Sequence, residues 1–213
     1  MKILGLLAGA ALLLGAQSAS AVTINNGSFE TTTPSSATFG TDGYSQENAG
    51  SSGIDGWDVD SGSVDIIGTY WTSSDGSQSL DLSGSNAGRI SQGLVGLTIG
   101  QEYTVSFDLA GNPTGGVKDL RVSAAGTQSL YSFNTAGKTG AAMGWATQTF
   151  VFIANAATAT LAFLSLTGGS GGPALDNVSI AATPIPGALL LFGSALGGMG
   201  FLGYRRKKLE VAA

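Results

Sequence analysis

The chain has 213 residues and a net charge of −5, and it contains neither cysteine nor histidine. The missing cysteines exclude disulfide bridges, and the missing histidines exclude Ser–His and Cys–His catalysis and the commonest zinc ligand. Residues 22–183 carry thirteen acidic and four basic side chains, a net charge of about −9 that repels phosphate backbones and argues against nucleic acid as a partner.

The first 21 residues have the layout of a secretory signal peptide. Lys2 provides a positive start, residues 3–16 form an apolar run, and Ala19-Ser20-Ala21 fits a small-residue cleavage site. We therefore expect export through the Sec pathway and a mature chain that begins at Val22. The alternative is a buried N-terminal helix.

Residues 22–183 are long enough for one domain with a hydrophobic core. Asn26-Gly27, Asp55-Gly56 and similar turn dipeptides separate short runs in which apolar and polar residues alternate, as in residues 103–109. No helical period occurs in this stretch. About ten short strands joined by Gly-rich turns predict a β-sandwich, so we expect an all-β fold.

Four further segments refine this expectation. Residues 148–153 and 160–166 are more continuously apolar, which predicts central strands covered on both faces. Residues 31–53 are polar and rich in Ser, Thr and Gly, and residues 167–173 are rich in Gly. We expect long loops at both places.

The two ends of the domain, residues 26–30 and 174–180, together form the most specific candidate site. In the closing segment, Asp176, Val178 and Ile180 occupy every second position. If the strand buries those two side chains, Asp176 also points inward. A buried carboxylate without a partner is costly, so some group has to compensate its charge.

Two kinds of compensation remain open for this carboxylate. Neither Lys nor Arg lies near Asp176 in the sequence. A calcium ion accepts carboxylate and main-chain oxygens in a flexible geometry, so its candidate ligands are the carboxylates of Glu30 and Asp176 with main-chain oxygens near Ser28 and Asp176. The alternative is a pair of carboxylates hydrogen-bonded to loop amides.

The three tryptophans, one neighbouring tyrosine and one arginine are considered as ligand-binding residues. Trp57 and Trp145 adjoin apolar strands, so a place in the core is expected for both. Tyr70 and Trp71 precede a polar loop and are candidates for a platform on which a sugar ring stacks; the alternative is aromatic rings folded back onto the sheet edge. Arg89 is a candidate for binding a ligand hydroxyl or a nearby acid.

Catalysis is not expected. Glycoside hydrolysis needs two opposed carboxyl groups at a defined separation in a cleft. Asp58, Asp60 and Asp65 are close in sequence, but they lie among turn signals, where solvated acidic side chains are common.

The chain ends in three parts in a fixed order. Pro184-Ile185-Pro186 comes first, residues 187–204 form an apolar stretch, and Arg205, Arg206 and two lysines follow. A stretch of about 18 residues spans roughly 27 Å as a helix, just enough to cross a hydrocarbon core. The basic cluster favours the cytoplasmic side. We expect a transmembrane helix that anchors or sorts the preceding domain.

This tail resembles the PEP-CTERM sorting signal of bacteria, in which a Pro-x-Pro motif, a helix and an Arg-rich end are recognised by an exosortase. The resemblance rests on Pro184, Pro186, the run 191–197 and the Arg205-Arg206 pair. It implies a membrane enzyme as partner, removal of the tail and transfer of the protein to the surface. Ile185 stands where the family has glutamate, so cleavage itself stays open. The alternative is an ordinary single-span anchor.

The ectodomain carries a second set of motifs. The opening Asn-Gly-x-Phe-Glu, the following Gly56-Trp57 and the closing Leu-Asp-Asn-Val are similar to galactose-binding-type jelly-roll domains, which include many carbohydrate-binding modules. Further runs cover residues 66–71, 75–84, 88–92, 107–112 and 172–178. Together they resemble the choice-of-anchor C family, bacterial surface domains that carry one of several sorting tails.

This resemblance implies a jelly-roll fold and a surface address, and it leaves the ligand undefined. In the related carbohydrate-binding modules the opening glutamate and the closing aspartate hold a structural calcium, which corresponds here to Glu30 and Asp176. The expected organisation is a signal peptide at 1–21, an ectodomain at 22–183 and a sorting signal at 184–213. The expected function is non-catalytic binding of polysaccharide in the cell envelope or extracellular matrix. The alternative is a structural biofilm protein without a specific small ligand.

Overall fold

The computed structural model describes residues 22–33, 39 and 41–184. The expected signal peptide lies outside the described residues, as does most of the expected sorting signal, with its transmembrane helix, Pro186, Arg205 and Arg206. Within the described part of the chain, no helix is long and apolar enough to cross a membrane.

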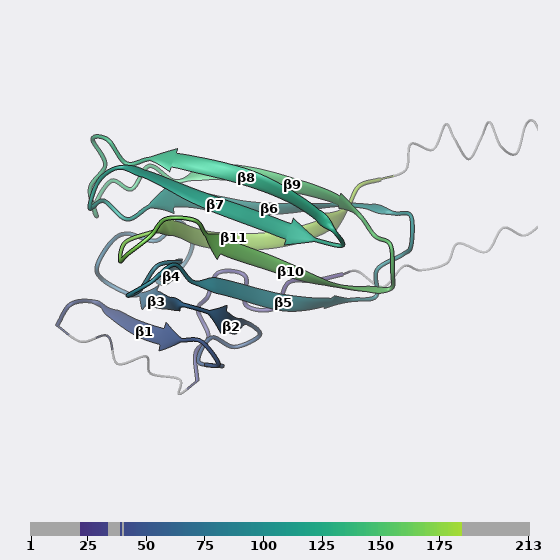
Figure 1. The fold of residues 1–213 in the computed structure, drawn as a ribbon, viewed down its shortest axis with the longest axis horizontal. Helices are drawn as coiled ribbons and strands as arrows, with labels where there is room; N and C mark the ends of the chain where they lie inside the picture. Colours follow the sequence, from purple (N-terminus) through teal and green to yellow (C-terminus); the bar gives the residue numbers. More distant parts are fainter. Residues whose placement is uncertain (1–21, 34–38, 40, 185–213) are drawn as a thin grey trace, which may run out of the picture.

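Two antiparallel sheets pack face to face in a β-sandwich (Figure 1), which confirms the expected all-β class. The six-stranded sheet has the order β1-β3-β4-β11-β6-β9, and the five-stranded sheet has the order β2-β5-β10-β7-β8. The strands are β1 (Tyr44–Asn48), β2 (Asp58–Ser61), β3 (Ser63–Ile67), β4 (Ser79–Asp81), β5 (Arg89–Val95), β6 (Glu102–Gly111), β7 (Val117–Ala124), β8 (Thr127–Asn134), β9 (Ala146–Ile153), β10 (Thr158–Ser165) and β11 (Pro173–Ala182).

The hydrophobic core fills the space between the two sheets. Along β6, every second residue from Tyr103 to Leu109 is buried in this core, as the alternating sequence predicts. Trp57 is also in the core, as expected, and its ring lies against Phe29 and Phe163 with centroids 5.5 and 6.0 Å away. Each buried aromatic side chain stabilises the sandwich by roughly 1.5–3 kcal/mol of transfer free energy.

A β-bulge in β11 changes the face on which Asp176 lies. The pairing with β6 shifts register between Asp176 and Ser179, and Asn177 has a φ of 50° at this point. Val178 therefore enters the core, whereas Asp176 lies opposite Asp108 on the other face of the sheet. The expectation that Asp176 points inward with Val178 was wrong, because strict alternation does not continue through a bulge.

Two other local expectations also need correction. The apolar run 148–153 belongs to β9, which among the described strands pairs only with β6 and lies at the sheet edge, and Ile153 is exposed. The polar stretch 31–53 is not all loop, because β1 lies within it and pairs with β3. The run 160–166 does fall on a central strand, β10, between β5 and β7.

Candidate functional site

The outer face of the six-stranded sheet, which points away from the five-stranded sheet, collects polar residues from several strands. Gln46 lies opposite Asp65, which lies opposite Asp81, and Asp176 lies opposite Asp108. Directly opposite residues of an antiparallel pair point to the same face. The alternation that buries apolar residues inward thus gathers four aspartates on one outer face.

A pocket of about 420 Å³ opens over one end of this outer face. Strands β1 and β3 contribute Tyr44, Gln46 and Asp65, the loop after β3 contributes Tyr70, and the loop after β6 contributes Asn112. The volume lies in the range of small-molecule sites. Aromatic, amide and carboxyl groups therefore converge on one concave place.

Two tyrosines form the aromatic part of the pocket. Tyr44 and Tyr70 are 37% and 43% exposed, and their rings meet edge to face with centroids 5.9 Å apart. The backbone fixes this pair, because the amides of Gly68, Thr69 and Tyr70 all donate to the carbonyl of Gly43, which directly precedes β1. The ring faces that remain open are suited to stacking against an apolar ligand surface.

Asp81 is a buried carboxylate whose hydrogen-bonding needs are met within the protein. Its Oδ1 accepts from the amides of Ser83 and Gly172, both at 2.8 Å, and its Oδ2 accepts from Asn112 Nδ2 at 2.8 Å. Burial raises the pKa of Asp81 above its usual value, against the effect of these donors. Asp81 thus fixes the loops that border the pocket.

Asp65 is also buried, though less completely than Asp81, and its Oδ1 has no such donor among the described residues. The side chain is 9% exposed and lines the pocket, and its Oδ1 is shielded from solvent without a hydrogen-bond partner. Burial, followed by the charge of Asp81, raises the pKa of Asp65 to about 6. The expectation of a solvated turn residue was therefore wrong for Asp65, which lies inside β3.

Gly84 lies closely against this carboxyl group. A Cβ atom at position 84 would come within 2.8 Å of Asp65 Oδ1 and 3.2 Å of Gln46 Cγ. Contacts shorter than 3.0 Å force a neighbouring group to move. The absence of a side chain at this position thus keeps Asp65 and Gln46 where the pocket has them.

Asp176, one of the expected calcium ligands, fastens residues 72–78, the second part of the loop that joins β3 to β4. Its Oδ2 accepts from the amides of Ser74 and Asp75 at 2.8 and 2.9 Å, and its Oδ1 accepts from its neighbour Asn177 at 2.7 Å. Asp176 is completely buried. Burial raises the pKa of Asp176 to about 6, and the charge of Asp75 adds to the rise, against the three amide donors.

Glu30 holds the other end of the same loop. Its Oε1 accepts from the amides of Ser77 and Gln78 at 2.8 and 2.7 Å, and its Oε2 accepts from Ser77 Oγ at 2.7 Å. Ser28 Oγ donates to Asp75 Oδ2 at 2.7 Å. The two ends of the domain therefore meet around one loop, as the sequence suggested.

The expected calcium ligands fit an ion poorly in this arrangement. Each of the two carboxylates already accepts three hydrogen bonds, out of about four that a carboxylate can accept. Among the described residues, no group of three or more acidic side chains is placed to hold a metal ion. The geometry of Glu30, Asp176 and Ser28 is that of the other alternative, in which loop amides compensate the charges. Calcium binding stays an expectation of the resemblance, and this geometry argues against it.

Trp71 is folded back onto the sheet, which was the alternative to an exposed aromatic platform. It is 4% exposed, packs on the outer face with Ile67 and Met143, and donates from Nε1 to Ser79 Oγ at 2.8 Å. Its ring faces are covered, so of the expected pair only Tyr70 is open to a ligand. Trp145 is half-buried against the same cluster and donates to Thr72 O, so it is not a core residue.

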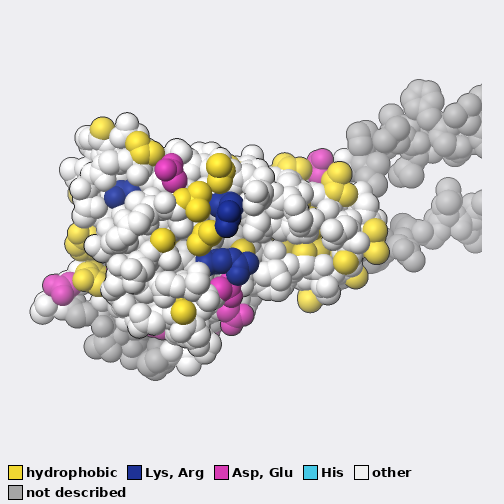
Figure 2. All heavy atoms as spheres, in the orientation of Figure 1, with side chains coloured by type: hydrophobic (Ala, Val, Ile, Leu, Met, Phe, Trp, Pro, Cys, Tyr) yellow, Lys and Arg dark blue, Asp and Glu magenta, His cyan; other side chains and the backbone are white. Residues whose placement is uncertain are grey.

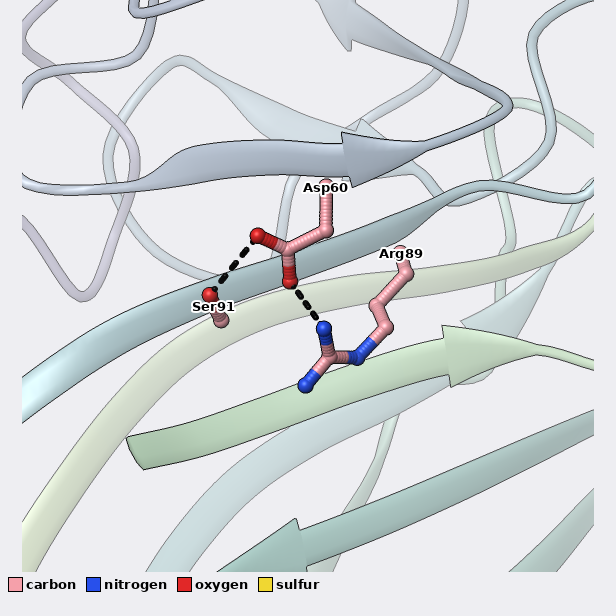
Figure 3. A network of polar contacts seen from close by, with 3 residues as sticks. All are labelled: Asp60, Arg89 and Ser91. Carbon is pink, nitrogen blue, oxygen red and sulfur yellow. Dashed lines mark hydrogen bonds and ion pairs between the residues drawn. The ribbon is translucent and has the colours of Figure 1, made fainter. Parts of the chain in front are cut away.

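Arg89 lies on the outer face of the five-stranded sheet, away from the pocket. Its NH1 is 2.5 Å from Asp60 Oδ2, and Ser91 Oγ donates to Asp60 Oδ1 at 3.1 Å (Figure 3). In the register, Arg89 and Arg121 both lie opposite Leu164, and basic and acidic side chains meet near the middle of this face (Figure 2). Arg89 was expected to bind either a ligand hydroxyl or a nearby acidic side chain, and the structure shows the acidic side chain, Asp60.

Several pocket residues carried no clear sequence signal. Tyr44 and Gln46 lie in a stretch that composition assigns to a loop, and Asn112 follows a strand like many other loop residues. Asp65 did carry a signal, since a lone acid interrupts the apolar run Val64 to Ile67. A carboxylate inside a strand that is otherwise apolar points to a buried or functional group.

The sequence of the domain that forms this pocket is similar to known proteins. Residues 22–181 match the family described as "Protein of unknown function (DUF642)". The chain belongs to this DUF642 family. One relative is Halomucin from Haloquadratum walsbyi (strain DSM 16790 / HBSQ001), 37% identical over 167 residues. The match takes in 76% of this chain and only 2% of Halomucin.

Two solved structures illustrate the likeness of the DUF642 domain to known folds. A xylan-binding CBM22 domain from Paenibacillus barcinonensis aligns with a TM-score of 0.46 and 13% identity, over 66% of this chain and 94% of that domain. A family 35 carbohydrate-binding module from Clostridium thermocellum aligns with a TM-score of 0.41 and 16% identity, over 64% and 90%. At these values the likeness leaves the ligand of this chain to be argued from its own pocket.

Proposed function

We propose that this DUF642 protein is a non-catalytic carbohydrate-binding module and that the pocket on the outer face is its binding site. One observation carries the proposal. Two half-exposed tyrosines, Tyr44 and Tyr70, line the same pocket as the buried carboxyl group of Asp65, whose Oδ1 has no hydrogen-bond partner among the described residues. The sheet and its loops fix all three groups, so the site is formed before a ligand arrives.

The chemistry of the pocket suits a sugar ring. A pyranose has apolar patches of C–H groups that stack on aromatic faces, which Tyr44 and Tyr70 provide. Its hydroxyl groups donate and accept hydrogen bonds, and Gln46 and Asn112 offer amide groups at the same place. Asp65 accepts from a hydroxyl without having to give up a partner.

The same pocket is poorly arranged for glycoside hydrolysis. That reaction uses two carboxyl groups on opposite sides of the scissile bond. Among the described residues that line the pocket, Asp65 is the only acid. Its neighbour Asp81 is 1% exposed and is occupied by three donors. The proposal is therefore binding without catalysis.

The proposed place of action is the cell surface or the extracellular polysaccharide matrix. The signal-peptide pattern of residues 1–21 supports export through the Sec pathway. The Pro-x-Pro motif, apolar stretch and basic end support transient anchoring in the membrane and sorting by an exosortase. Polysaccharide is the proposed partner after sorting.

A glycan array probed with residues 22–184 and with two variants tests the binding function. Tyr70→Ala removes an exposed ring from the pocket. Leu130→Ala, at a side chain on β8 that is 70% exposed, removes apolar area far from it and serves as control. We expect glycan signals that Tyr70→Ala lowers at least tenfold and Leu130→Ala leaves unchanged. An array without signals would overturn the proposal and favour the structural matrix protein.

A further inference from the structure

The four aspartates on the outer face differ in the number of hydrogen-bond donors that surround each carboxylate. Asp81, Asp108 and Asp176 each accept three hydrogen bonds from the protein. For Asp108 the donors are Thr147 Oγ1, Ser74 Oγ and Asn177 Nδ2, and they hold its pKa below the usual value although burial opposes them. Asp65 Oδ1 accepts none from the described residues. The first three therefore serve the fold, and Asp65 is left to serve a ligand.

The surroundings of Asp65 accumulate negative potential that nothing in the pocket neutralises. Asp81 lies directly opposite on the next strand. Among the described lining residues there is neither lysine nor arginine. Lys118, a buried cation whose charge acts on Asp81, donates from Nζ to the carbonyl oxygen of Gly171 and is not part of the lining. A ligand that brings a positive charge would supply what the site lacks.

The aromatic side of the pocket favours the same kind of group. The negative face of a phenol ring attracts an ammonium ion, by about 0.5–1 kcal/mol at exposed sites and more where water is excluded. Tyr44 and Tyr70 hold their rings beside Asp65 in the same pocket. A carboxylate next to aromatic faces is selective for an amine over a neutral hydroxyl and repels an anion.

From this arrangement we infer that the pocket selects a sugar with a free amino group, so that Asp65 accepts from the ammonium while Tyr44 and Tyr70 flank it. The inference rests on the proposed carbohydrate-binding function and names its substrate class: glycans with non-acetylated amino sugars. Glycans built of uronic acids or carrying sulfate are excluded by the same charge. The acidic surface of the domain also steers cationic chains toward it.

Three matched tetrasaccharides test this inference. The β-1,4-linked tetramers of glucosamine, N-acetylglucosamine and glucose differ in the group on C2, which is an ammonium, an acetamide or a hydroxyl. Isothermal titration of the protein with each is expected to give at least tenfold tighter binding of the glucosamine tetramer. Asp65→Asn is expected to abolish this preference. Asp58→Asn, which makes the same charge change at an exposed position on β2, is expected to keep it.

The outcomes separate the inference from the function on which it rests. Equal binding of the three tetramers, or a preference that survives in Asp65→Asn, would overturn the inference and leave carbohydrate binding intact. The same holds if array glycans without amino groups bind and the glucosamine tetramer does not. If no glycan binds at all, the amino-sugar inference and the proposed carbohydrate-binding function are both wrong. Thermal unfolding of each variant verifies that it is folded during the titration.

Discussion

Asp65 and Asp81 face each other across β3 and β4, yet Asp81 accepts three hydrogen bonds, whereas Asp65 Oδ1 is buried without a partner among the described residues. Both carboxyl groups are buried on the same face of the same sheet. The donors to Asp81 come from the residues after β4, β6 and β10, and none of these three donors also binds Asp65. Asp81 therefore anchors the surrounding loops, whereas Asp65 is a carboxylate in a pocket whose charge is not compensated by hydrogen-bond donors.

The first prediction is that Asp65→Asn stabilises the protein near neutral pH. The pKa of Asp65 is about 6 in the folded state, above its value in an unfolded chain. A raised folded-state pKa gives stability that is complete below about pH 4 and is lost as the pH rises toward 6. We expect Asp65→Asn to raise the free energy of unfolding by about 1–3 kcal/mol at pH 7 and by little at pH 3.5.

Urea unfolding at the two pH values measures this difference. Asp58→Asn, at an exposed position, is the control and should change stability by less than about 0.5 kcal/mol at either pH. A variant Asp65→Asn that is less stable than the wild type at pH 7 would show that the carboxylate has a partner that stabilises it.

The second prediction concerns Asp176 and the loop it fastens. Asp176→Ala leaves the buried amides of Ser74 and Asp75 without their acceptor, and we expect a loss of about 2–4 kcal/mol. Hydrogen exchange should show the two amides losing protection before the core strands do. If both amides stay protected in the variant, another acceptor replaces the carboxylate.

Calcium provides the third prediction. Since the carboxylates of Glu30 and Asp176 are already hydrogen-bonded to loop amides, we expect the thermal midpoint of residues 22–184 to be the same with calcium and with a chelator. A ligand that binds only the folded state would raise the midpoint by mass action. A clear drop with the chelator that disappears in Asp176→Ala would establish the calcium site.

The fourth prediction uses Gly84. Gly84→Ala places a methyl group within 2.8 Å of Asp65 Oδ1, so the carboxyl group has to move within the pocket. We expect glycan binding to weaken at least tenfold. Gly93→Ala is the matched control, because a Cβ atom there meets no other group within 4 Å. Unchanged affinity in Gly84→Ala would mean that the position of Asp65 does not matter for binding.

The fifth prediction separates Trp71 from its neighbour Tyr70. Trp71 is buried on the outer face, so Trp71→Ala should cost about 3–5 kcal/mol of stability, as large-to-small changes of buried aromatic residues do. Tyr70→Ala should cost less than about 1 kcal/mol and act on binding instead. Urea unfolding of both variants gives the answer, and similar losses for the two would contradict the assignment of only Tyr70 to the site.

Much of the fold follows from local patterns in the sequence. Alternation along β6 and the turn dipeptides indicate antiparallel strands, and the apolar run on β10 indicates a central strand. The bulge at Asn177 does not follow, because its one extra residue shows only in the pairing with β6. The same limit applies to β9, whose apolar sequence says nothing about whether a second neighbour is present.

The candidate site was less accessible to prediction. The sequence suggested a link between Glu30 and Asp176, and the structure shows that both bind one loop, but the loop amides that meet them belong to a distant segment. Tyr44 gains its role only by pairing of β1 with β3 and by contact with Tyr70. Such contacts between residues far apart in the sequence are set by tertiary packing, and composition does not encode them.

The direction of β11 has a consequence for how the domain presents its pocket. The strand begins at Pro173, next to the pocket residue Gly171, and ends at Ala182, where Thr183 N donates to Glu102 O (Figure 1). Ten residues of strand span about 30 Å. The described C-terminal end of the domain at Thr183 therefore lies at the opposite end of the sandwich from the pocket, and the length of the sandwich separates the two.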